Sequence, residues 1–188
     1  MSKLIFISIL VLNLISCDYY SKDYSGLSAY DKNGNIYVVV ENTKGDTRDI
    51  VYDTKAKAYH VKGQVEFPHP TNTGFIPSTI NSSQGPLDVL IYSKELEKGQ
   101  TLSTKPIGIL KYKLENVIQF KIVVIPIVEE FVLDPIKDFE DFSSQNLELR
   151  KQLSKWVLQS YTAGDIQLLG WYDEDEALSV IEHYRIRA

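Results

Sequence analysis

The sequence is poor in cysteine, methionine and histidine, with one cysteine, one methionine and three histidines in 188 residues. The single cysteine, Cys17, cannot form a disulfide bond within the chain, so disulfides of its own do not hold the fold together. The three histidines have no spacing typical of a metal site, which argues against a zinc centre. Internal repeats and a second globular domain are also absent from the pattern of the sequence.

The N-terminal apolar run is too short for a membrane-spanning helix, which needs roughly 20 residues. This run, residues 4–15, follows Lys3 and is typical of a cleaved signal peptide, expected here over residues 1–16. It ends in Leu14-Ile15-Ser16-Cys17, which resembles the lipobox of bacterial lipoproteins. The resemblance implies that Cys17 is lipid-modified and anchors the mature chain in the bacterial cell envelope, on the periplasmic or outer-surface side. The alternative is a buried free thiol after a chance apolar run.

Positive charge is in deficit, because Lys and Arg total 20, Asp and Glu total 25, and the formal net charge is −5. Removing residues 1–16 takes away one lysine and no acid, which makes the charge −6. A mildly acidic domain argues against nucleic acid or an anionic membrane surface as its partner. Residues 17–35 are rich in Ser, Tyr, Asp and Gly, and we expect a flexible tether whose tyrosines are exposed or contact a partner. Residues 36–188 suffice for one domain with a sizeable core.

Strand signals dominate the first part of the domain and helix signals its last third. The β-branched run 36–41 predicts a strand buried on both faces. Further strands are expected at 49–53, 57–61, 65–67, from Asp88 onward, and at 101–112, 117–128 and 166–169. Residues 71–84 indicate a long polar loop and 138–141 a solvated acidic loop, whereas apolar spacing predicts helices at 146–161 and 173–186. This order predicts an α+β fold whose sheet closes into a small barrel.

Residues 81–93 place one carboxylate, Asp88, after a rigid Gly85-Pro86 turn at the start of an apolar strand. This stretch and five other strings resemble the soluble, Mg-dependent inorganic pyrophosphatases in order and spacing. The matching strings are 36–41, 74–76, 85–90, 105–111, 121–126 and Gly170-Trp171. The resemblance covers about residues 36–187 and implies a closed five-stranded, OB-like β-barrel with two packed C-terminal helices.

The resemblance also implies a chemistry, the hydrolysis of diphosphate by water that metal ions activate. Mg²⁺ takes hard oxygen ligands in octahedral array, so an active member needs several converging carboxylates. In the family signature Asp-X-Asp-Pro-X-Asp the third aspartate is Asp88, but the first two positions fall on Ser83 and Gly85. The positions of two further metal-binding acids are Leu114 and Gln119.

Several other positions that the resemblance assigns to the site keep a suitable residue. Glu41 aligns with an early glutamate, Lys121 with a phosphate-binding lysine and Tyr161 with a late phosphate-binding tyrosine. Glu115, next to one lost acid, is a further candidate metal ligand. Changed phosphate-site positions fall near Asp49, Val51, Gly63, His69, Thr73 and Thr162. From the residues alone, Asp88 is either a metal ligand or a carboxylate that caps the turn, and Glu41 either pairs with Lys121 or belongs to a remnant of the site.

Two hypotheses follow from a scaffold that is kept and acids that are lost. The first is a lipid-anchored pyrophosphatase homologue with an eroded metal site, little or no hydrolysis, and a pocket repurposed for a ligand such as phosphate or diphosphate. The second is an active inorganic diphosphatase with a reduced metal site and Mg²⁺ as cofactor. Its candidate groups are Glu41, Asp88, Glu115 and Lys121. Both hypotheses leave a homo-oligomer open.

Overall fold

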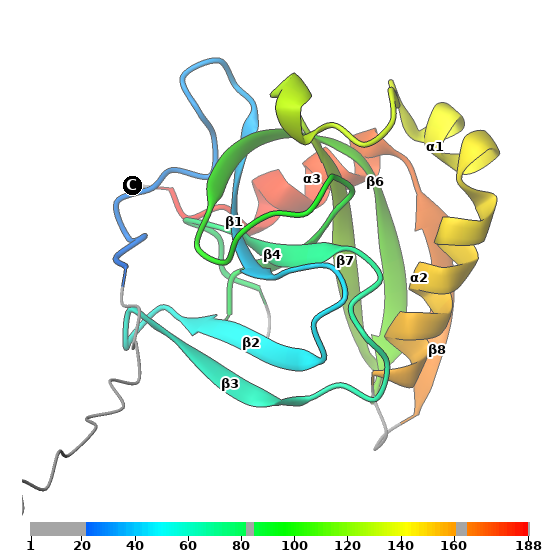
Figure 1. Cartoon of the computed structure of the whole chain (residues 1–188), viewed down its shortest axis with the longest axis horizontal. Helices are drawn as coiled ribbons and strands as arrows, with labels where there is room; N and C mark the ends of the chain where they lie inside the picture. Colours follow the sequence, from blue (N-terminus) through cyan, green and yellow to red (C-terminus); the bar gives the residue numbers. More distant parts are fainter. Residues whose placement is uncertain (1–21, 82–84, 161–164, 188) are drawn as a thin grey trace, which may run out of the picture.

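Within the described residues, 22–81, 85–160 and 165–187, six strands of this computed structural model form one mixed sheet (Figure 1). The strands are β1 (Ile36–Asn42), β4 (Asn72–Ile76), β5 (Leu87–Ile91), β6 (Thr101–Leu114), β7 (Val117–Pro126) and β8 (Ile166–Tyr172). Their order is β1-β4-β5-β7-β6-β8, and β1 also pairs with β6. Five strands therefore close into a ring, and β8 extends the sheet beyond β6. The β5–β7 pair is parallel and the other pairs are antiparallel.

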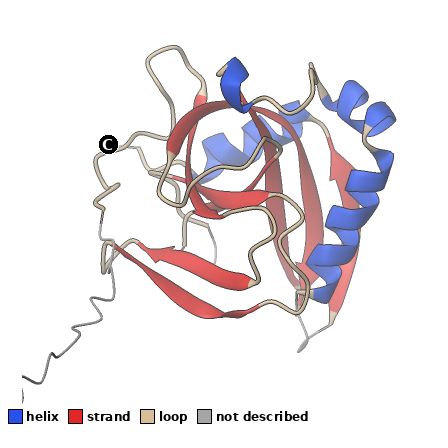
Figure 2. Cartoon of the chain, in the orientation of Figure 1, coloured by secondary structure: helices blue, strands red, loops and turns tan. Residues whose placement is uncertain are grey.

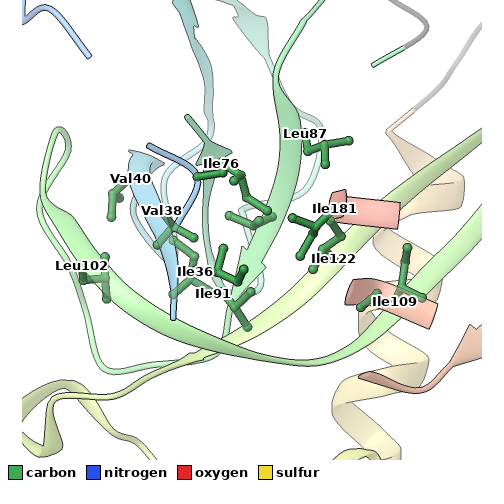
Figure 3. Close-up of a cluster of buried hydrophobic side chains, with 14 of the residues drawn as sticks. Ile36, Val38, Val40, Ile76, Leu87, Ile91, Leu102, Ile109, Ile122 and Ile181 are labelled. Carbon is green, nitrogen blue, oxygen red and sulfur yellow. The ribbon is translucent and has the colours of Figure 1, made fainter. Parts of the chain in front are cut away.

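The ring is filled by alternate side chains of its strands, because successive residues of a strand point to opposite faces. Ile36, Val38 and Val40 of β1 lie in this cluster (Figure 3). The other strands contribute Ile76, Leu87, Ile91, Leu102, Ile109 and Ile122. Val39 points the opposite way and is also buried, in a second cluster with Phe75. Strand β1 is therefore buried on both faces, as its β-branched run predicts.

Three α-helices cover the sheet in the described part of the chain, α1 (Phe139–Gln145), α2 (Leu147–Gln159) and α3 (Glu174–Tyr184). Helices α1 and α2 lie together beside β6 and β8 (Figure 2). Phe142, Leu153 and Trp156 pack with apolar residues of the sheet in a third buried cluster. Helix α3 instead packs Ala177 and Ile181 into the cluster inside the ring.

The remaining strands, β2 (Arg48–Asp53) and β3 (Ala58–Gln64), form a separate antiparallel hairpin across the turn 54–57. A short 3-10 helix, η1 (Glu129–Phe131), follows β7. These elements confirm the expected hairpin, the long strands β6 and β7, and the two helices expected near the C-terminus. The α+β class is confirmed, and the expected closure is present as a ring of five strands.

One expected strand and one expected loop are wrong. Residues 65–67 are not a strand. Strand β3 ends at Gln64, and the alternating apolar and polar residues that follow it are not paired with any strand among the described residues. The polar loop expected at 71–84 contains β4, which is buried at all five residues. Its Asn72 donates a hydrogen bond to Ser93 Oγ at 2.9 Å, so the polar side chain has a partner inside the fold.

The acidic run 138–141 was expected to be a solvated loop, and this expectation is wrong because the run begins α1. Asp138 is the N-cap, and its side chain accepts a hydrogen bond from Asp141 N at 2.9 Å. Ser143 and Ser144 lie inside α1, and α2 begins after Asn146.

The segment from Lys22 to β1 packs on the fold, in contrast to the flexible tether expected there. Tyr24 is 2% exposed, so its expected exposure is wrong. Its hydroxyl donates to Gly99 O at 3.0 Å and accepts from Tyr59 Oη at 2.9 Å, and Ala29 is fully buried. The expected signal peptide, Cys17 and residues 18–21 lie outside the described residues. None of the described helices is long and apolar enough to cross a membrane.

Candidate functional site

A cavity of about 190 Å³ lies between the β2–β3 hairpin, the ring and α2. Its charged lining residues come from five different strands and are Glu41, Asp49, Lys62, Asp88 and Lys121. Three of them, Glu41, Asp88 and Lys121, are the residues that the resemblance gives as kept from the family site, and the fold brings these three into the one cavity.

Two uncharged residues set the shape of this cavity. A side chain at Gly74 of β4 would place its Cβ 2.0 Å from Val39 O, so glycine is needed where β4 passes β1. The amide of Asn42, at the end of β1, donates to Ile50 O at 2.9 Å and Thr73 Oγ1 at 3.0 Å, and accepts from Ile50 N at 2.8 Å. Asn42 thus fastens the hairpin to the ring over the cavity. Sequence reasoning missed it, since a polar residue at the end of an apolar strand was its only signal.

The Lys121 ammonium is bound to Asp88. Lys121 Nζ donates to Asp88 Oδ2 at 2.5 Å, and the lysine side chain is 17% exposed against 46% for the aspartate. The parallel register of β5 and β7, which pairs Val89 with Ile122, sets the two side chains next to each other. The sequence left open an ion pair between Glu41 and Lys121. In the structure, Lys121 forms an ion pair with Asp88.

Glu41 is a buried acid, 7% exposed, at the end of β1. Its Oε1 accepts a hydrogen bond from Tyr52 N at 2.7 Å. Burial, and then the nearby charge of Asp88, raise the pKa of Glu41 to about 8, against the smaller opposing effects of the Tyr52 amide and Lys121. The carboxyl group of Glu41 is therefore protonated in most molecules near pH 7.

His69 forms another wall of the cavity. Its Nε2 lies 3.0 Å from Arg48 O, and its ring centroid lies 5.2 Å from that of Trp156. Burial lowers the pKa of His69, so the ring is neutral near pH 7. Its buried Nδ1 has no hydrogen-bond partner among the described residues. The resemblance assigned His69, Asp49 and Thr73 to phosphate-site positions, and all three line the cavity.

The fold does not bring Glu115 into the cavity. Glu115 is exposed in the β6–β7 turn, with φ of 47°, and is not among the described residues of the lining. About 13 Å of strand separates the start of β7 at Val117 from Lys121. Tyr161, the other predicted substrate-binding residue, lies outside the described residues, as does Ser83.

The family model for inorganic pyrophosphatase matches residues 38–188. The chain belongs to the inorganic pyrophosphatase family. It is 31% identical over 156 residues to an inorganic pyrophosphatase of Haemophilus influenzae, covering 79% of this chain and 86% of that one. It is 26% identical over 151 residues to one of Haloferax volcanii, covering 79% and 85%. A crystal structure of an inorganic pyrophosphatase from Neisseria gonorrhoeae superposes with a TM-score of 0.75 at 27% identity, over 86% of this chain and 96% of that chain. The resemblance drawn from the short strings is confirmed as a family relationship.

Pyrophosphatase chemistry with Mg²⁺ needs several ionised oxygen ligands around each ion. The described lining of this cavity has three acids: Asp88, which is bound to an ammonium group, Glu41, whose burial opposes its ionisation, and Asp49. Over residues 22–81, 85–160 and 165–187, no group of three or more His, Cys, Asp or Glu is placed to hold a metal ion. The described donors therefore do not fit a pair of Mg²⁺ ions.

Proposed function

We propose that this member of the inorganic pyrophosphatase family has an eroded metal site, hydrolyses diphosphate weakly or not at all, and uses its cavity for binding. One observation carries the proposal: Asp88, the last acid of the family signature that this chain keeps, is paired with Lys121, and the described lining adds only two further acids, Glu41 and Asp49. A metal ion beside Asp88 must displace the ammonium group or lie next to a like charge. Glu41 does not compensate while it is protonated.

The magnitude of the loss supports weak or absent metal binding. At an effective dielectric near 20, one carboxylate about 4 Å from a unit charge contributes roughly 4 kcal/mol before desolvation. The resemblance places four neutral residues, Ser83, Gly85, Leu114 and Gln119, where the family has acids. The four lost carboxylates outnumber the three acids that the described lining keeps, Glu41, Asp49 and Asp88.

The ligand we propose for the cavity is phosphate or diphosphate. Lys121 keeps the position of a family phosphate-binding lysine, and Lys62 adds a second positive charge to the lining. Tyr161 is the proposed further contact, on the basis of the resemblance alone. Asp49 and Asp88 oppose an anion, so the expected affinity is low unless the ligand displaces Asp88 from Lys121.

We further propose that lipid on Cys17 anchors the chain in the bacterial cell envelope. The short apolar run and the string Leu14-Ile15-Ser16-Cys17 support this. A homo-oligomer, which the family relationship leaves open, would need all its lipid groups on one side. Mass spectrometry of the N-terminal peptide of the mature protein tests the lipid directly.

The alternative function is an active inorganic diphosphatase with a reduced metal site and Mg²⁺ as cofactor. The convergence of Glu41, Asp88 and Lys121 in one cavity favours it. Glu115, the fourth residue of that hypothesis, lies in the turn outside the lining and contributes nothing to this support.

A phosphate-release assay with diphosphate and millimolar Mg²⁺ or Mn²⁺ separates the two functions. We expect no turnover, and no Mg²⁺ binding by calorimetry. Turnover that Asp88→Asn abolishes would establish the alternative and contradict our proposal. The matched control is Asp175→Asn, which makes the same chemical change at an exposed position of α3 and should leave any turnover intact.

A further inference from the structure

The fold fixes the N-terminal segment firmly from Lys22 onward. Tyr52 Oη donates to Lys22 O at 2.9 Å, and Lys57 Nζ lies 2.6 Å from Asp23 Oδ2. The Tyr24 ring packs edge-on against Tyr52, with centroids 5.0 Å apart, and its hydroxyl is bonded to Gly99 O. Among the described residues, Lys22 is therefore the fixed point nearest to Cys17; it lies beside the turn of the β2–β3 hairpin, and we call it the exit point.

This exit point limits how far the domain can move from a lipid on Cys17. Five residue steps join Cys17 to Lys22, and a fully extended chain spans at most about 18 Å over that length. A tether that continued to residue 35 would reach about 60 Å. A domain of this size is about 40 Å across. The longer tether would let any face of the domain touch the membrane, whereas the shorter one confines contact to the surface around the exit.

We propose that the surface around Lys22 is the membrane-facing surface of the anchored protein. This exit face consists of residues 22–25, the turn 54–57, Ile80 and Ile186. The inference rests on the lipid at Cys17 that forms part of the proposed function. Its partner is a phospholipid bilayer.

The chemistry of the exit face suits a bilayer. Lys22, Lys55 and Lys57 are exposed there, Lys57 is paired with Asp23 at 2.6 Å, and Asp53 adjoins the turn, so the face carries a small positive charge although the whole chain is acidic. Exposed lysines attract the anionic headgroups of a bilayer. The argument from net charge against an anionic membrane surface therefore does not extend to this face.

The same face also has apolar character. A cavity of about 200 Å³ opens between Tyr24, Phe75 and Ile186. Ile80 and Ile186 line it and are 43% and 54% exposed. Partly exposed isoleucines beside exposed lysines match the apolar and charged layers of a bilayer interface.

This orientation keeps the candidate site away from the membrane. Asp49 lines the site, whereas Asp53 begins the exit turn, and four residues of β2 place them about 13 Å apart. Helix α2, which forms another wall of the site, lies on the far side of the molecule from the exit (Figure 1). A soluble ligand can then reach the site while the exit face lies on the bilayer.

Engineered cysteines can test the orientation, because Cys17 is the only cysteine and lipid modification consumes its thiol. Lys55→Cys places a label on the exit face, and Lys151→Cys places a matched label on α2, where the lysine is also exposed. The lipidated mature chain, which begins at Cys17 and is labelled with a fluorophore, is reconstituted in phosphatidylcholine–phosphatidylglycerol vesicles that carry a headgroup quencher. We expect the label at position 55 to lose most of its fluorescence and the label at 151 to keep most of it. Equal quenching at both positions would overturn the proposal.

The failure of the anchor and the failure of the orientation give different results. An N-terminal peptide without the mass of a lipid would overturn both, whereas a lipidated peptide with equal quenching would overturn the orientation and leave the anchor standing. A second variant tests the short tether itself. Inserting about 14 flexible Gly and Ser residues before Lys22 adds about 50 Å to the fully extended reach and should reduce the difference between the two labels. An unchanged difference would show that tether length does not orient the domain, and this would overturn the argument.

Discussion

The two ends of the β2–β3 hairpin are built in opposite ways. At the turn end, Tyr24, Tyr52 and Tyr59 pack edge to edge, and their hydroxyls bond to one another or to main-chain carbonyls. At the other end, a cavity of about 190 Å³ gathers three acids and two lysines, and Glu41 is held there largely protonated.

The contrast shows that one end of the hairpin stabilises the fold and the other end can bind a ligand. Buried aromatic rings with bonded hydroxyls stabilise a fold through area and satisfied hydrogen bonds. Burying a carboxyl group costs free energy unless it is well paired, and an empty cavity forfeits packing contacts. The turn end therefore holds the hairpin in place, and the cavity end provides the polar groups that a ligand can use.

Removing the Tyr24 ring should cause the largest loss. Tyr24→Ala deletes a ring that is 2% exposed and frees both of its hydroxyl partners, so we expect a loss of about 3–5 kcal/mol in the free energy of unfolding. Tyr24→Phe keeps the ring and should cost only about 1–3 kcal/mol. Urea unfolding measures both variants. A loss below about 0.5 kcal/mol for Tyr24→Ala, as for an ordinary surface change, would show that residues 22–25 form a loose tether after all.

Glu41 should give the next largest effect, and its effect should depend on pH. Its pKa rises from 4.5 in the unfolded chain to about 8 in the fold, so the folded state binds the proton more tightly. The resulting stabilisation is complete below pH 4.5 and is lost as the pH rises through about 8. Glu41→Gln cannot ionise, so its free energy of unfolding should exceed that of wild type by roughly 2–4 kcal/mol at high pH. Glu140→Gln, on the exposed side of α1, should keep the wild-type profile. Parallel profiles for wild type and Glu41→Gln would contradict the protonated state of Glu41.

The sequence predicts the elements whose own residues decide their structure. The β-branched run of β1 and the apolar spacing of α2 and α3 need no knowledge of their neighbours. Strand β4 was missed because Asn72 reads as a loop residue, and it is acceptable in the core only since Ser93 and Lys94 provide hydrogen-bond partners there. Tyr24 was misjudged for the same reason, because its burial depends on Tyr52 and on residues still further along the chain.

The candidate site shows the same division. The turn Gly85-Pro86 and the following strand locate Asp88, and family spacing locates Lys121. Which of two acids Lys121 pairs with depends on the parallel register of β5 and β7, and one sequence does not specify that register. The role of Asn42 likewise depends on how the hairpin folds back over β1, which gives the side chain its partner Ile50.

Breaking the link between the hairpin and the ring should have an intermediate effect. Asn42→Ala removes three hydrogen bonds from a site that is nearly closed to water, and we expect a loss of roughly 2 kcal/mol in the free energy of unfolding. The control is Asn33→Ala in an exposed turn, which should stay within about 0.5 kcal/mol of wild type. Equal stability of the two variants would show that Asn42 does not fasten the hairpin.

Magnesium should have the smallest effect, and its size tests the proposed function. A site whose Kd is ten times the Mg²⁺ concentration raises the free energy of unfolding by less than about 0.1 kcal/mol, whereas a site saturated at 100 times its Kd adds about 2.7 kcal/mol. We therefore expect the same thermal midpoint with excess EDTA and with millimolar Mg²⁺. A clear rise with Mg²⁺ in wild type would contradict the eroded site.

The variant Lys121→Met shows whether the ammonium group is what excludes the metal. The Lys121–Asp88 pair is partly exposed to solvent, so its loss should change stability by no more than about 1 kcal/mol. If Mg²⁺ raises the midpoint of Lys121→Met but not that of wild type, the ion pair itself blocks a site that the remaining acids can still form. If neither midpoint moves, the cavity lacks the carboxylates for Mg²⁺ even without the lysine, because Asp88 and Asp49 are too few and Glu41 keeps its proton. We expect the second result, since Mg²⁺ requires more oxygen ligands than these two aspartates provide.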